Sequence, residues 1–238
     1  MIRYFLFTAI SLFSLYLKAQ EISGEDLLNK TIAYHDPNGA WSSFSGSFHV
    51  RMETPDGTTR KSAITINLPQ SFFSVTSTKA EEKITQTIAH GNCTILINGK
   101  ELTETEKAEK GNTCERAAMF KNYYTYLYGL PMKLKDKGTH VDEKVVRTLF
   151  KGKEYLRLKV TYDKSVGKDT WYFYFNPKNY AMEVYQFFHD ESKNDGEYIL
   201  LSDTEEIQGI KMPKNRAWYY NKEDGYLGTD ILSTRLQK

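Results

Sequence analysis

Alternating apolar and polar residues mark most of this chain as β-strand. The alternation is clearest in residues 169–190, where Trp171 and Phe173 fall on one face of a strand and Tyr172 and Tyr174 on the other. Successive strand side chains point to opposite faces, and phenylalanine and tryptophan favour dry surroundings more than tyrosine does. The pattern therefore predicts a β-hairpin at the centre of a large sheet, with its first face buried.

The second arm of this hairpin repeats the alternation after a turn at residues 176–179. Pro177 presets the backbone dihedral that a turn requires. With the period of two unbroken, the return arm would place Met182 and Val184 inward, and Tyr185 and Phe187 outward.

Short alternating segments recur along the rest of the chain, with turn residues between them. They cover 43–52, 64–68, 72–77, 83–90, 93–97, 144–151, 154–163, 197–203, 211–221 and 226–236. The connections are too short for crossover helices, so the sheet is predicted to be antiparallel. About eleven strands are too many to stay flat, and the sheet should curl.

Two segments show helical spacing instead. Ser23 with Asp26 three residues later is typical of a helix start, and the first helix is expected to end near His35. A second helix is predicted over 114–128, followed by Gly129, with the apolar stripe Ala117, Phe120, Tyr124 and Leu127. This stripe should lie on the inward face of the sheet. The charged segment 103–110 is predicted to be an exposed loop.

The amino-terminal residues 1–19 have the composition of a secretory signal peptide. A basic start, a short apolar core and Ala19 form this pattern, with an uncleaved anchor as the alternative. Cleavage would remove Arg3 and Lys18 from 32 basic residues against 30 acidic ones, leaving a formally neutral chain. Nucleic acid is therefore not an expected partner. Residues 20–238 are expected to form a single domain.

The two cysteines, Cys93 and Cys114, form an even pair in a chain that we expect to be exported. A disulfide between them is the favoured interpretation, and two buried thiols that never meet are the alternative. Neither cysteine lies near the expected cleavage site, so a lipid anchor on a new amino-terminal cysteine is not expected. The chain has no Cys-x-x-Cys redox motif.

Several segments resemble known envelope proteins. They are residues 126–136 and 166–169, the turn Asn176-Pro177-Lys178 and residues 209–213. With the leading helix and the long meander, they resemble the LolA/LolB-like envelope lipoprotein carriers and an uncharacterised secreted Gram-negative family of that superfamily. The resemblance implies an unclosed antiparallel β-barrel with helices covering its concave face. The missing anchor cysteine implies the soluble carrier branch.

The aromatic content of 14% is the feature that bears most on function. It is explained either by a large ordinary core or by an unfilled apolar groove on the concave face. The residues expected to line such a groove are Phe44, Phe48, Ile64, Ile66, Phe120, Tyr124, Trp171, Phe173, Met182 and Trp218.

No catalytic or cofactor motif occurs in the sequence, and its five histidines are scattered. His35-Asp36 and His189-Asp190 are expected in solvated turns rather than in a metal or acid–base site. We therefore expect no cofactor, no metal and no enzymatic activity.

The leading hypothesis is a monomeric periplasmic or secreted protein that binds an acyl chain, a lipoprotein or another hydrophobic ligand, with transient membrane contact. The alternative is a protein- or glycan-interaction module with a filled barrel, which would present outer tyrosines such as Tyr172, Tyr174 and Tyr185.

Overall fold

The computed structural model describes residues 22–235, which are mostly β-strand. The strands are β1 Ser45–Glu53, β2 Thr59–Asn67, β3 Phe72–Lys79, β4 Glu82–Ala89, β5 Asn92–Ile97, β6 Lys100–Glu101, β7 Thr139–Phe150, β8 Lys153–Tyr162, β9 Thr170–Phe175, β10 Met182–Phe188, β11 Glu197–Ile207, β12 Ile210–Tyr220 and β13 Tyr226–Ser233. The α-helices are α1 Gly24–His35, α2 Glu104–Glu109 and α3 Cys114–Gly129, and the 3-10 helices are η1 Ala40–Ser43, η2 Met132–Lys135 and η3 Glu191–Lys193.

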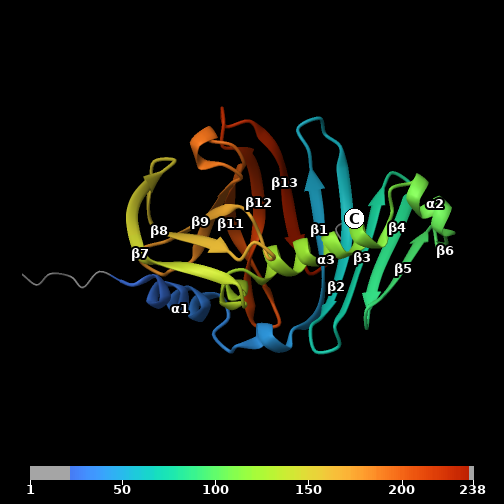
Figure 1. Cartoon of the computed structure of the whole chain (residues 1–238), viewed down its shortest axis with the longest axis horizontal. Helices are drawn as coiled ribbons and strands as arrows, with labels where there is room; N and C mark the ends of the chain where they lie inside the picture. The colour runs from blue at the N-terminus through green and yellow to red at the C-terminus, as the bar shows by residue number, and fades with distance from the viewer. Residues whose placement is uncertain (1–21, 236–238) are drawn as a thin grey trace, which may run out of the picture.

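The strands form one antiparallel sheet that curls but does not close (Figure 1). Its order is β6-β5-β4-β3-β2-β1-β13-β12-β11-β10-β9-β8-β7, so neighbours in the sheet are neighbours in the chain except where β1 meets β13. The predicted unclosed antiparallel barrel is confirmed. The thirteen strands exceed the expected eleven in part because β6, with two residues, is too short to show an alternation.

Helix α1 begins where the sequence predicted. The backbone N–H of Asp26 donates to Ser23 Oγ at 3.1 Å, and the helix ends at His35. Such an N-cap satisfies a backbone donor that has no partner within the helix.

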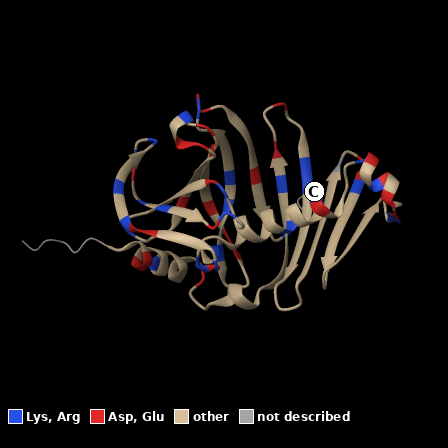
Figure 2. Cartoon of the chain, in the orientation of Figure 1, with Lys and Arg blue, Asp and Glu red and all other residues tan. Residues whose placement is uncertain are grey.

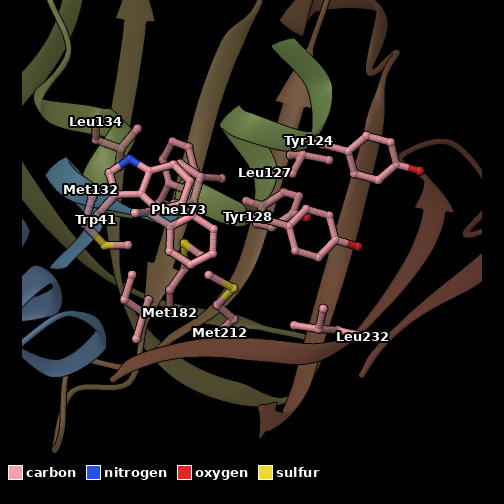
Figure 3. Packing of buried hydrophobic residues seen from close by; sticks show 14 of the residues in the cluster. Trp41, Tyr124, Leu127, Tyr128, Met132, Leu134, Phe173, Met182, Met212 and Leu232 are labelled. Atoms are coloured by element: carbon pink, nitrogen blue, oxygen red, sulfur yellow. The ribbon is translucent and has the colours of Figure 1, made fainter. Parts of the chain in front are cut away.

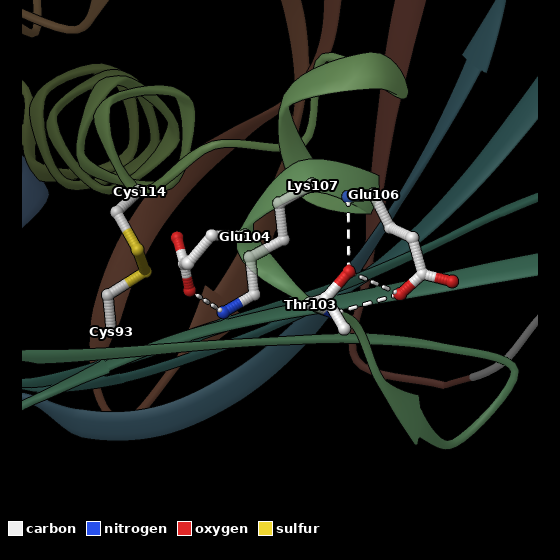
Figure 4. Close-up of polar contacts among 6 residues, drawn as sticks. All are labelled: Cys93, Thr103, Glu104, Glu106, Lys107 and Cys114. Atoms are coloured by element: carbon white, nitrogen blue, oxygen red, sulfur yellow. Dashed lines mark hydrogen bonds and ion pairs between the residues drawn. A yellow bond between two sulfur atoms is a disulfide. The ribbon is translucent and has the colours of Figure 1, made fainter.

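The prediction of a loop over 103–110 was wrong, because this segment contains the short helix α2. Thr103 Oγ1 accepts from the backbone N–H of Glu106, and the Glu106 carboxylate accepts from the backbone N–H of Thr103 (Figure 4). Lys107 Nζ lies 2.7 Å from Glu104 Oε1. This reciprocal capping box stabilises a helix that carries too few apolar residues to show a stripe.

Helix α3 crosses the concave face of the sheet (Figure 1). Its first residue, Cys114, forms a disulfide with Cys93 of β5, with the two Cα atoms 5.9 Å apart (Figure 4). The predicted pairing is confirmed. The disulfide fixes the start of α3 over the β3–β5 side of the sheet, and its stripe residues Ala117, Tyr124 and Leu127 are buried.

The return arm of the central hairpin differs from the simple alternation. The register between β9 and β10 shifts between Met182 and Val184, which is a β-bulge. A bulge adds one residue to a strand, so the side chains beyond it exchange faces. Tyr185 is therefore fully buried in the main core, whereas Val184 packs in a second cluster with Tyr155 and Tyr174. The predicted outward position of Tyr185 was wrong for this reason.

In the part of the chain from 22 to 235, no helix is long and apolar enough to cross a bilayer. The predicted signal peptide, residues 1–19, lies outside the described residues.

Candidate ligand-binding site

The ten residues predicted to line a groove all belong to one apolar interior. Phe120, Trp171 and Trp218 are partly buried at its border. The other seven are almost fully buried within it: Phe44, Phe48, Ile64, Ile66, Tyr124, Phe173 and Met182. The structure thus brings the ten residues together, although most of them contact other core residues and not solvent.

Side chains of α3 fill the space directly beneath the helix. The Tyr128 ring centroid lies 4.8 Å from that of Phe48, and the Tyr124 ring centroid lies 6.3 Å from that of Phe73. Figure 3 shows Tyr124, Leu127 and Tyr128 projecting from α3 into the packed core. A ligand that entered this space would have to displace the helix or its side chains, because protein interiors are close-packed.

Partly exposed aromatic rings gather beside α3, where the helix faces β8, β9, β10 and β12. We call this set the aromatic rim, and it comprises Tyr123, Tyr126, Tyr162, Trp171, Phe187 and Trp218. The Trp171 centroid lies 5.6 Å from that of Tyr126 and 4.9 Å from that of Phe187. The rings of Tyr123 and Trp218 are stacked with their centroids 6.3 Å apart.

Two cavities open along the flank of α3 at this rim. One, of about 480 Å³, is lined by Tyr126, Tyr162 and Trp171 together with polar residues of η2 and of the loop after β8. The other, of about 640 Å³, is a shallow hollow lined by Glu115, Ala118, Met119, Asn122, Tyr123 and Tyr126. The two cavities share Asn122 and Tyr126, so they adjoin.

Met119, which was not predicted as a site residue, is 55% exposed on α3. It stands off the buried stripe of the helix, beside Ala118 and Asn122, which are also exposed. The sequence could have indicated this residue, because Met119 is an apolar residue on the helix face that normally carries polar side chains. With Tyr123 and Tyr126, Met119 gives the flank of α3 a largely apolar surface.

A buried carboxylate forms hydrogen bonds with two residues of the aromatic rim. Asp230 is 5% exposed and accepts hydrogen bonds from Tyr123 Oη and from Trp218 Nε1, both at 3.3 Å. Burial raises the pKa of Asp230, although the nearby Arg216 opposes this effect. Burial and the adjacent Asp230 likewise raise the pKa of Tyr123 well above its usual range. Tyr123 therefore keeps its phenol proton and donates it to the Asp230 carboxylate.

Arg216 is a fully buried cation within the same interior. It is the cross-strand partner of Asp230, and its Nη1 donates to the carbonyl oxygen of Pro213 at 2.8 Å. Its guanidinium carbon lies 4.0 Å from the ring centroid of Tyr128. Within residues 22–235, the buried hydroxyls of Tyr128 and Tyr185 have no hydrogen-bond partner. Polar groups are therefore present within the mainly apolar interior.

Comparison with known proteins agrees with this architecture. Residues 2–234 match the family of unknown function DUF6503. The chain belongs to this family. A search of curated proteins finds no match.

The DUF6503 chain also resembles solved structures of low sequence identity. A LolA superfamily protein from Nitrosomonas europaea is 12% identical with a TM-score of 0.53, covering 91% of this chain and 94% of that one. An outer membrane lipoprotein-sorting protein domain from Vibrio parahaemolyticus is 7% identical, with a TM-score of 0.47 and coverage of 91% and 93%. A DUF1329 family protein from Desulfovibrio piger is 10% identical, with a TM-score of 0.47 and coverage of 88% and 90%. The first of these structures, with a TM-score of 0.53, shows that the DUF6503 chain has the LolA-like fold that its sequence resembles.

Both histidine–carboxylate pairs were expected in solvated turns; His189 is exposed, but His35 and Asp36 are buried, so the prediction was wrong for the first pair. His35 is buried, and its ring nitrogens bond the backbone groups of Lys211 and Met182. Asp36 instead accepts from the backbone N–H groups of Ala40 and Trp41 at 2.7 and 2.9 Å. Among the described residues, no three His, Cys, Asp or Glu side chains gather in a way that could hold a metal ion.

Proposed function

We propose that this DUF6503 protein is a non-enzymatic carrier of the bacterial envelope. It binds an acyl chain, or a protein that bears one, along the flank of α3. It acts in the periplasm or after secretion, as a monomer that contacts membranes transiently. Export by residues 1–19 and the single domain formed by residues 20–238 are parts of the same proposal.

The observation that carries this proposal is the aromatic rim with its two adjoining cavities. Trp171 of β9 and Trp218 of β12 present partly exposed rings beside α3, and Met119 extends the apolar surface along the helix. Ligand sites in proteins are concave, mostly apolar and supplied with a few polar groups. The cavity at Tyr126, Tyr162 and Trp171 meets this description, because it combines aromatic rings with a few polar residues.

The energetics of acyl chains suit a carrier. Burial of one methylene in protein gives about 0.8 kcal/mol, and insertion of a methylene into a bilayer gives about the same amount. The two free energies nearly cancel, so cargo can pass between a membrane and an apolar groove without being trapped in either.

The first test is native mass spectrometry of the protein purified from its own envelope, followed by organic extraction and lipid analysis. A stoichiometric co-purifying lipid or acylated species is the expected result. An apo mass, together with no uptake of a fluorescent fatty acid afterwards, would refute the carrier.

A pair of surface variants locates the site. Met119→Asp places a charge in the hollow beside α3 and should weaken uptake of a fluorescent fatty acid by about tenfold, since a carboxylate is costly in an apolar contact. Leu149→Asp is the matched control, because Leu149 is an exposed apolar residue at the end of β7, 73% exposed and outside both cavities. Equal uptake by the two variants would exclude the α3 flank as the site.

The filled space beneath α3 favours a second candidate, the protein- or glycan-interaction module. Of the outer tyrosines expected for it, Tyr174 and Tyr185 are buried and only Tyr172 stays partly exposed. The aromatic rim would then be its contact surface. Pull-down of an unlipidated protein or a glycan in the absence of any bound lipid would support this candidate over the carrier.

A further inference from the structure

The loop that joins β8 to β9 exposes an apolar residue between two lysines. It comprises residues 163–169, with the sequence Asp-Lys-Ser-Val-Gly-Lys-Asp. Val166 in the middle of the loop is 56% exposed, and Lys164 and Lys168 on either side of it are also exposed. The backbone N–H of Val166 donates to the carbonyl oxygen of Asp163 at 2.8 Å, so the chain turns here. More than half of the valine is therefore available for contact with another surface.

The two lysines of this loop carry positive charges that no acidic side chain contacts. Among the residues that the structure describes, neither Lys164 nor Lys168 forms an ion pair. Asp163 and Asp169, which bound the loop, each lie 2.7 Å from a histidine ring nitrogen instead. Basic and acidic positions are interspersed over the molecule in Figure 2, so the positive charge of this loop is local. Both lysines can pair with anionic groups outside the protein.

The same loop forms part of the wall of a cavity at the aromatic rim. Ser165, Val166 and Gly167 line the cavity of about 480 Å³, together with Tyr126 and Trp171. The two lysines are not among its lining residues. A surface that contacts Val166 therefore lies beside the cavity without filling it.

The flank of α3 continues this apolar surface. Met119, 55% exposed, lines the neighbouring hollow, which shares Asn122 and Tyr126 with the cavity at Val166. Residues 119, 122 and 126 are three and four positions apart, so they follow one face of the helix. The hollow also contains one acidic residue, Glu115. The positive charge is therefore at the loop, whereas exposed apolar side chains occur at both ends of this surface.

We propose that the β8–β9 loop and the exposed flank of α3 form a docking surface for a membrane that contains anionic lipids. Val166 and Met119 enter the boundary between headgroups and acyl chains, and Lys164 and Lys168 pair with the anionic headgroups. Two lysines and two small apolar contacts give weak, reversible binding that is sensitive to salt. This proposal rests on the carrier function, because docking places the cavity beside the bilayer from which an acyl chain is taken.

Co-sedimentation of the full chain with lipid vesicles at low ionic strength tests the docking surface. The protein should bind phosphatidylcholine vesicles that contain phosphatidylglycerol, and should bind vesicles of phosphatidylcholine alone much more weakly. The variant Lys164→Gln/Lys168→Gln should weaken binding to the anionic vesicles by roughly tenfold or more, since each lysine near an anionic surface contributes to the attraction. Val166→Asp should have at least the same effect, because it places a carboxylate between the two lysines.

A matched control removes the same net charge elsewhere. Lys100→Gln/Lys178→Gln changes two exposed lysines, one in β6 and one in the turn between β9 and β10, and should leave vesicle binding unchanged. No binding of the wild type to anionic vesicles, or equal binding of the two double variants, would overturn the docking surface. Binding only to envelope membranes that retain their proteins would also overturn it, and would assign this surface to a protein partner.

A transfer assay separates the docking surface from the carrier function. Uptake of a fluorescent fatty acid from solution should be unchanged in Lys164→Gln/Lys168→Gln, because neither lysine lines the two cavities. Transfer of the same probe from anionic vesicles should be slower in this variant. Uptake from solution without vesicle binding would refute the docking surface alone, and vesicle binding without any uptake would support the docking surface while refuting the carrier.

Discussion

The buried histidine of α1 makes the stability of this protein depend on pH in a predictable way. His35 is 3% exposed, and its Nε2 accepts the backbone N–H of Met182 at 2.9 Å. Because an amide can only donate, the proton of the neutral ring is on Nδ1, which donates to the carbonyl oxygen of Lys211 at 2.6 Å. A second proton on Nε2 would break the contact with Met182.

The size of the effect follows from the pKa of His35. Burial lowers this pKa from 6.5 to about 4, while the hydrogen bond to Lys211 acts in the opposite direction. The unfolded chain therefore binds a proton at a higher pH than the folded one does. The stabilisation is fully present above pH 6.5 and is lost as the pH falls toward 4. It amounts to about 3 kcal/mol, at about 1.4 kcal/mol for each pKa unit.

Urea denaturation of the wild type and of His35→Gln at pH 7.5 and at pH 4 measures this contribution. At pH 7.5 the variant should be less stable than the wild type, by about 1 kcal/mol for each hydrogen bond that it loses. Its free energy of unfolding should then fall between the two pH values by about 3 kcal/mol less than that of the wild type. Carboxylates that titrate over the same range act in both proteins and cancel in the difference.

A second histidine, His189, serves as a control because its pKa is shifted in the opposite direction. A hydrogen bond to Asp169 raises the pKa of His189, so protonation of this exposed ring favours the folded state. His189→Gln should therefore lose stability preferentially at low pH, whereas His35→Gln loses it preferentially at neutral pH. If the stability of His35→Gln and of the wild type fell in parallel from pH 7.5 to pH 4, the assigned role of His35 would be refuted.

Two further predictions concern the core and its covalent link. Replacement of Cys93 and Cys114 by alanine should lower the free energy of unfolding by about 3 kcal/mol, because the disulfide closes a loop with a sequence separation of 21 residues; an unchanged urea midpoint would contradict this. Arg216→Met should cost about 1 to 3 kcal/mol, since it removes the hydrogen bond to the Pro213 carbonyl and a nearby positive charge from the buried Asp230 carboxylate. The double variant Arg216→Met/Asp230→Asn should be less damaging than the sum of the single variants, and simple additivity would show that the two residues are not coupled.

Local patterns in the sequence were sufficient for most strands, for the helices α1 and α3 and for an antiparallel sheet that curls. The alternation at Phe48, Ile64 and Phe173 identified strand faces that are indeed buried. The Ser23 cap and the stripe on residues 114–128 identified α1 and α3. These signals are reliable because strand and helix periods depend on backbone geometry alone.

The failures occurred where one residue changes the register or where a helix is stabilised by polar groups. The bulge between Met182 and Val184 moved Tyr185 inward, and no alternation reveals such an extra residue. Tyr174 was expected at the surface, but it packs against Tyr155 and donates to Gln186 at 2.6 Å. Tyrosine is accepted on either face when its hydroxyl has a partner.

The sequence by itself determined an antiparallel sheet and a covering helix, because both follow from the periodicity of residues close together in the chain. It also indicated the Cys93–Cys114 disulfide, because only two cysteines are present to pair. Only the tertiary structure decided how much of the interior is filled. Trp171 and Trp218 are partly buried at the border of the core, whereas Phe173 and Met182 are buried inside it. The curvature of the sheet and the side chains of α3 determine how much of each side chain is exposed.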